Sequence, residues 1–105
     1  MYILSGTGEL RIGNEKVGVR AGDYAAFPPG PDHSHTLTNT GTEPLRYLSL
    51  SNQNTTDICV YPDSKKIAFV GLPDPSAWPS GAWIFRLIKD QPSVDYYDGE
   101  DTGEP

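Results

Sequence analysis

The sequence has few of the residues on which many functional classes depend. It contains a single cysteine, Cys59, so no disulfide can form within the chain. No apolar run approaches the ~18 residues that a membrane-spanning helix needs. The start of the chain also lacks the basic and apolar regions of a secretory signal. We therefore expect a cytoplasmic protein with no membrane partner.

Basic residues are scarce as well. Eight lysines and arginines stand against 14 aspartates and glutamates, which gives a formal net charge of −6. Because phosphate groups are neutralised by Lys and Arg, this acidic balance argues against nucleic acid as a partner. The chain also has no Gly-x-Ser-x-Gly motif, no phosphate-binding loop and no Cys-x-x-Cys pair. Its 105 residues correspond to a single domain.

Glycine and proline are abundant, with 11 and 10 copies that punctuate short apolar runs. Polar and apolar residues alternate within these runs, which predicts strands with one buried face. Residues 24–27 are nearly all apolar and predict a more fully buried strand. Strands at such short, regular spacing indicate an all-β sandwich or barrel. The strands expected in the first half are residues 2–5, 9–12, 16–20, 24–27, 33–39 and 44–51.

The second half continues with further short strands and then becomes irregular. Residues 57–61 and 66–70 predict two strands with a turn between them, and residues 82–88 form a strong apolar run that favours a strand. Cys59 lies within an apolar run, which favours a small buried hydrophobe over a reactive thiol. We expect one domain over residues 1–105. Its barrel core is expected at residues 1–70 and an irregular C-terminal arm at residues 71–105.

Both histidines lie in one stretch of residues 22–39. His33 and His35 occupy alternate positions of the predicted return strand, so both would point to the same face. A hydrogen-bonded position in the core or in a pocket, a role as a metal ligand, and contact with a ligand without metal are all compatible with this pattern. If the protein has a site, its sequence places the site here.

The same stretch carries a resemblance to a known family. The spacing Gly22-x5-Pro28-x-Gly30, followed by His35-x3-Asn39, resembles the second conserved motif of the cupin superfamily. Residues 2–10 resemble the segment that follows the first cupin motif. Two more segments are similar to parts of small single-domain bacterial cupins: Tyr-Pro-Asp-Ser at residues 61–64 and Tyr-Asp-Gly-Glu at residues 97–100.

The resemblance implies a fold and a site. Cupins are jelly-roll β-barrels (double-stranded β-helices), and their metal site takes two histidines and a glutamate from the first motif and one histidine from the second. By its distance from Asn39, His35 corresponds to the second-motif histidine, and His33 is the second choice. The first motif belongs upstream of Tyr2, and no matching residues precede it. The resemblance therefore implies an N-terminally shortened barrel with an incomplete ligand set, which would suit Fe, Mn, Ni, Cu or Zn if completed.

Two functions follow as hypotheses. The first is a dimeric barrel of binding or structural type, metal-free or with a weak, incomplete metal site, that holds a small molecule or none. The second is a small metal-dependent enzyme of dioxygenase, isomerase or epimerase type that acts on a small polar metabolite. The missing first motif favours the non-enzymatic hypothesis. We expect a homodimer through the exposed barrel edge and the C-terminal arm, because missing strands leave ladder edges open. The residues expected to line a ligand pocket are His35, Tyr24, Phe27, Leu37, Asn39 and Tyr47.

Overall fold

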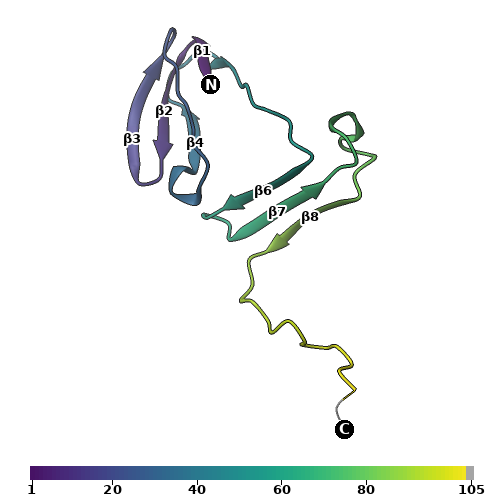
Figure 1. Cartoon of the computed structure of the whole chain (residues 1–105). Coiled ribbons are helices and arrows are strands. Elements are labelled where there is room, and N and C mark those ends of the chain that lie inside the picture. The colour runs from purple at the N-terminus through teal and green to yellow at the C-terminus, as the bar shows by residue number, and fades with distance from the viewer. Residues whose placement is uncertain (104–105) are drawn as a thin grey trace.

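The computed structural model describes residues 1–103, and within these residues the chain is all-β (Figure 1). Besides strands it forms two short 3₁₀ turns, η1 (Pro31–His33) and η2 (Pro75–Ala77). The all-β class predicted from the sequence is confirmed. The last two residues of the expected C-terminal arm, 104–105, lie outside the described part. The strands are β1 (Tyr2–Ser5), β2 (Thr7–Ile12), β3 (Glu15–Arg20), β4 (His35–Asn39), β5 (Arg46–Leu48), β6 (Thr56–Tyr61), β7 (Lys66–Gly71) and β8 (Ile84–Lys89).

The N-terminal half forms two small antiparallel sheets that share a core. One has the order β3-β2-β4, and the other pairs β1 with β5. On β2, Leu10 lies opposite Val17 of β3 and Leu37 of β4. The tight turn between β2 and β3 needs Gly13, whose φ is 57°, and a Cβ there would lie 2.8 Å from the Asp32 carbonyl oxygen.

The packed core of this half is small. It consists of Ile3, Leu10 and Val19, which the alternation of β1, β2 and β3 turns toward one another. Leu10 is the most deeply buried of them, with 1% of its surface exposed. Side chains packed around this core are only partly buried: Met1, Ile12, Ala25, Phe27, Leu37 and Leu45. Most of the stabilisation of this half therefore comes from few side chains.

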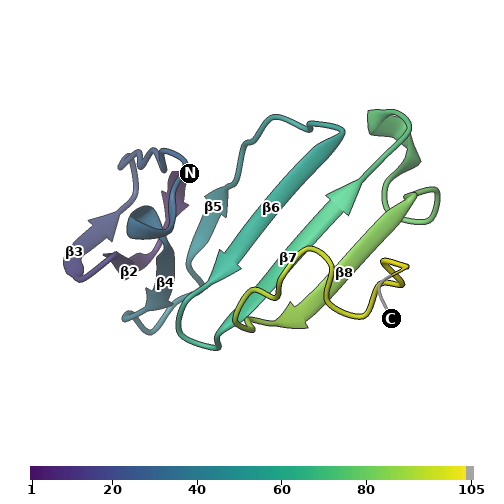
Figure 2. The same cartoon turned by 60° about the horizontal axis from the view of Figure 1, so that its bottom comes forward.

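The C-terminal half is a three-stranded antiparallel meander, β6-β7-β8, in which sequence neighbours pair (Figure 2). These strands confirm those predicted at residues 57–61, 66–70 and 82–88, with β8 starting two residues later than expected. The sheet also places β8 of the expected C-terminal arm beside β7. Every residue of β6 and of β8 is exposed, whereas the central strand β7 is mostly half-buried.

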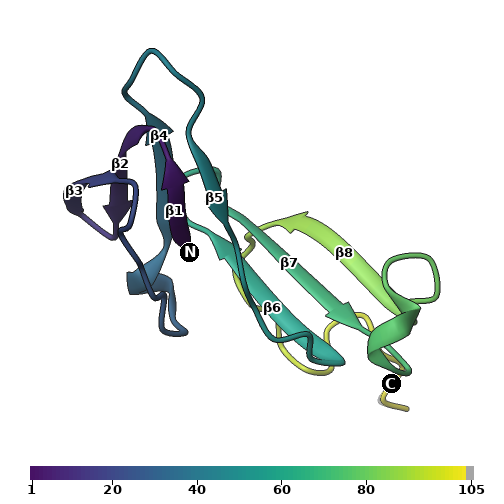
Figure 3. The ribbon, with the colours of Figure 1, turned by 90° about the horizontal axis from the view of Figure 1, so that it is seen from above.

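The two halves do not close into one compact body. Residues 49–55 lead from β5 into β6 without a strand of their own, and the three sheets of residues 1–103 share no ladder (Figure 3). The radius of gyration is 18.8 Å, against about 13 Å for a compact chain of this length. The principal extents are 66 × 33 × 22 Å. Residues 1–103 contain no helix that could span a lipid bilayer.

Four local predictions differ from the structure. The strand expected at residues 44–51 is limited to β5, and Cys59 is exposed rather than buried. Residues 24–27 do not form a strand: Tyr24 makes an isolated bridge to Tyr2 and is 70% exposed. The Ala25 N–H donates to the Met1 carbonyl, but Pro28 and Pro29, which follow, have no N–H with which to continue a ladder. His33 does not begin the return strand either, because Pro31 opens the 3₁₀ turn η1, and β4 starts only at His35.

Candidate functional site

The corner that precedes β4 positions the two histidines. Gly30, with a φ of 119°, turns the chain into η1, and Pro31 occupies the first position of that turn. The backbone N–H of His33 donates to the Gly30 carbonyl at 3.1 Å. Ser34 closes the turn, since its backbone N–H and its hydroxyl both donate to the Pro31 carbonyl, at 3.2 and 2.7 Å. His33 is thereby held in the turn and His35 in the strand.

His35 stacks on Phe27. The two ring centroids lie 3.5 Å apart and the ring planes differ by 8°. Phe27 in turn packs against the core of Ile3, Leu10 and Val19, so the stack connects the imidazole to the best-packed part of the molecule. Such a contact fixes the ring plane of His35 and leaves its nitrogens at the edge of a flat apolar surface.

His33 is oriented by the backbone instead. Its Nδ1 lies 3.2 Å from the carbonyl oxygen of Pro29. A carbonyl only accepts, so this hydrogen bond requires the proton on Nδ1 and leaves Nε2 of the neutral ring as an acceptor. The turn therefore presents one defined tautomer of His33.

Both histidines line an open hollow of about 900 Å³, which we call the histidine hollow. Phe27, His33 and His35 form one wall, and the opposite wall comes from β6 with Val60 and Tyr61. The walls therefore belong to the two halves of the chain. Arg11 of the first half forms an ion pair with Asp63 of the β6–β7 turn at the rim of the hollow.

The structure brings together two of the six residues expected to line the pocket, Phe27 and His35. Tyr24 points to solvent, and Tyr47 is exposed on β5 opposite Ile3. Leu37 packs against the core. The Asn39 side chain closes the following turn: its amide donates to the Glu43 carbonyl and its oxygen accepts from the Gly41 N–H, both at 2.9 Å.

The histidine hollow does not fit the metal site that the cupin resemblance implies. Within residues 1–103 no three His, Cys, Asp or Glu side chains gather as a ligand set. The nitrogen of His33 nearest to the backbone is engaged with Pro29, and the ring of His35 is packed face to face on Phe27. A stable site for a transition metal needs three or four donors, so these two imidazoles alone do not make one.

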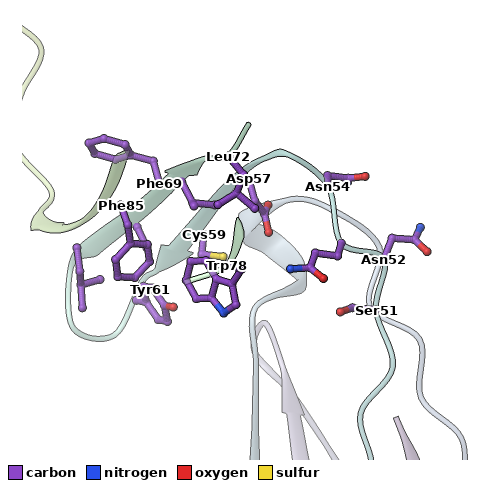
Figure 4. Close-up of a pocket in the computed structure, with 14 residues that line it drawn as sticks. Ser51, Asn52, Asn54, Asp57, Cys59, Tyr61, Phe69, Leu72, Trp78 and Phe85 are labelled. Carbon is purple, nitrogen blue, oxygen red and sulfur yellow. The ribbon is translucent and has the colours of Figure 1, made fainter. Parts of the chain in front are cut away.

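A second hollow of about 520 Å³ lies on one face of the C-terminal meander (Figure 4). Its lining includes Cys59, Tyr61, Trp78 and Phe85, and we call it the aromatic hollow. Trp78 meets Phe85 edge to face, with centroids 5.0 Å apart. Burial, followed by the nearby Asp57 carboxylate, raises the pKa of the Cys59 thiol, which favours its protonated form.

The sequence analysis did not predict the aromatic hollow. Residues 57–61 and 84–89 have apolar residues at odd and at even positions alike. Their pattern therefore indicates strands but no single buried face. The register that places Cys59, Tyr61 and Phe85 on one face becomes visible only in the paired strands.

Comparison with protein families supports the fold. Residues 1–51 match the family model for the cupin domain. This match supports a small protein of the cupin superfamily, and the antiparallel sheets are consistent with the jelly-roll class. No curated protein and no solved structure matched the chain.

Proposed function

We propose that this cupin-fold protein binds a small polar molecule in the histidine hollow and does so without a resident metal ion. The observation that carries the proposal is the stacked pair of Phe27 and His35, which forms a rigid wall of a hollow of about 900 Å³. Ligand pockets typically have volumes of 300–1,000 Å³ and combine apolar walls with a few polar groups.

The chemistry of the walls defines the kind of ligand. The flat surface of Phe27 and His35 suits a planar group, and the Nε2 acceptor of His33 suits a donor on the ligand. Arg11, already paired with Asp63, adds a guanidinium at the rim. These features favour a small planar molecule with polar substituents.

The metal-dependent enzyme remains the alternative, and the donor set argues against it. An enzyme of that type would need further ligands beside the imidazoles of His33 and His35, and residues 1–103 do not supply a third donor next to them. We therefore rank binding above metal-dependent catalysis.

The test follows the imidazole signals of ¹³C-histidine-labelled protein by NMR during separate titrations with benzoate, malonate and Zn²⁺. Benzoate supplies a ring and a carboxylate, whereas malonate supplies carboxylates alone. We expect saturable shifts with benzoate at millimolar concentration, at least tenfold weaker binding after Phe27→Ala or His35→Ala, and no change after Tyr47→Ala, which lies outside the hollow.

Two results would contradict the proposal. One is the absence of a saturable response to benzoate and malonate alike. The other is stoichiometric Zn²⁺ binding that is lost in His35→Ala, which would support the metal-dependent alternative instead.

A further inference from the structure

The sheet β6-β7-β8 exposes an apolar face whose centre is a row of three paired residues. Cys59 lies opposite Ala68, and Ala68 lies opposite Leu87. Side chains directly opposite in an antiparallel pair share a face, so this row crosses the whole sheet, and we call the surface around it the Cys59 face. Leu87 is 53% exposed and Phe85 on the same face is 52% exposed.

In the described part of the chain, residues 51–54 and the loop that carries Trp78 border this face, yet Phe85 and Leu87 stay more than half exposed. The opposite face of the sheet is apolar and exposed too, with Ile58 and Ile88, but among the paired strand residues it carries Arg86 and no carboxylate, so its charges do not complement a second copy of itself. A sheet that is apolar on both faces is stable in water only when both are covered. The Cys59 face therefore needs a partner.

The charged residues at the two ends of the Cys59 face indicate which partner covers it. Asp57 lies at one end of the Cys59 face, next to Val70, and two lysines lie at the other end, where Lys66 is paired with Lys89. The face is thus negative at one end and positive at the other, and a copy turned end for end would match it. We infer that a second copy of this chain covers the Cys59 face, with the two-fold axis along the row of Cys59, Ala68 and Leu87.

The alternative two-fold axis, parallel to the strands, is disfavoured by the same charges. It would place the lysine end of one sheet over the lysine end of the other, with Lys66 against Lys66 of the second copy. The axis along the central row instead brings Lys66 of one copy beside Asp57 of the other. It also lays Lys89 near the Trp78–Phe85 pair of the second copy, where a cation and an aromatic face attract.

This arrangement brings the two Cys59 residues face to face across the axis. Sheets packed face to face lie about 10 Å apart, so two thiols on the inner faces come within the span of a short bismaleimide. The dimer expected from the sequence then uses the face of the meander, to which β8 of the expected C-terminal arm contributes Phe85 and Leu87. The inference does not depend on a ligand in the histidine hollow.

The test is cross-linking of the otherwise unchanged protein, in which Cys59 is the single cysteine. Bismaleimidoethane should link most of the protein into dimers at micromolar concentration, and Cys59→Ala should abolish the product. Sedimentation should give a dimer mass without the cross-linker. A monomer mass, or no cross-link in a protein that sediments as a dimer, would overturn the inference.

Substitutions on the two faces of one strand add a matched comparison. Leu87→Glu should weaken the dimer at least tenfold, whereas Ile88→Glu, on the opposite face of β8, should leave it intact. Asp57→Lys should also weaken it, and the charge swap Asp57→Lys with Lys66→Asp should restore it. Loss of the dimer in Ile88→Glu but not in Leu87→Glu would place the interface on the face opposite to the Cys59 face and would contradict the inference.

Discussion

Leu10 shows how few residues hold the N-terminal half together. It lies in the middle strand β2, where it is paired with Val17 on β3 and with Leu37 on β4, and it is part of the core. Its neighbours in the core are Ile3 and Val19. With so few buried side chains, each one carries a large share of the stability.

We expect Leu10→Ala to lower the free energy of unfolding by about 2–5 kcal/mol, because it removes buried methyl groups and leaves a cavity. The measurement is urea denaturation followed by near-UV circular dichroism. Leu50→Ala is the control, since Leu50 is 73% exposed and its truncation should change the free energy by less than about 0.5 kcal/mol. Equal effects of the two substitutions would contradict the assigned core.

The turn between β6 and β7 is the clearest feature at the scale of elements. Residues 62–65 connect the strands, and Lys65 has a φ of 54°, in the left-handed region that non-glycine residues rarely adopt. The strand pairing on both sides is regular, from Tyr61 opposite Lys66 to Thr56 opposite Gly71. The hairpin therefore holds Lys65 in a conformation that its side chain disfavours.

Lys65→Gly should stabilise the hairpin by about 0.5–1 kcal/mol, because glycine adopts this conformation without the cost that a side chain carries. Thermal unfolding of the purified variant measures the effect. The neighbouring Lys66→Gly is the control: Lys66 lies in strand β7, where glycine should destabilise by about the same amount. A lower unfolding temperature for Lys65→Gly would show that its side chain makes contacts that outweigh the strain.

Local patterns predicted most strands but not how they pack together. Alternation located β3, β6 and β7 within about one residue and β2 within two, because pairing and pleat depend on neighbouring positions. The strand predicted at residues 24–27 does not form, because apolar composition alone does not supply a strand partner. His35 was identified by its motif spacing, yet its stack on Phe27 depends on the corner between them, and no periodicity encodes that contact.

At the scale of the whole molecule, the chain consists of two halves with different degrees of packing. The N-terminal half has a core of buried side chains, while β6 and β8 are exposed along their whole length. Besides the chain itself, the ion pair of Arg11 and Asp63 connects the two halves. An exposed ion pair contributes little to stability, so the C-terminal half should depend on the second copy.

Hydrogen exchange measured by mass spectrometry at several protein concentrations tests this division. Peptides from β6, β7 and β8 should become more protected as the concentration rises, because association covers the Cys59 face. Peptides from β2 and β3 should exchange at rates that do not depend on concentration. A uniform response along the chain, or none in the meander, would contradict the division into a self-sufficient half and a dependent half.

The pairing of β1 with β5 has a consequence for the order of folding. Tyr2 lies opposite Leu48, so this small sheet forms only after a long loop has closed, whereas β6, β7 and β8 pair with their neighbours in sequence. Contacts between residues distant in sequence form more slowly than local ones. During synthesis, the edge of β1 that faces β5 stays open until β5 has left the ribosome, so the better-packed half of the protein is expected to set the folding rate.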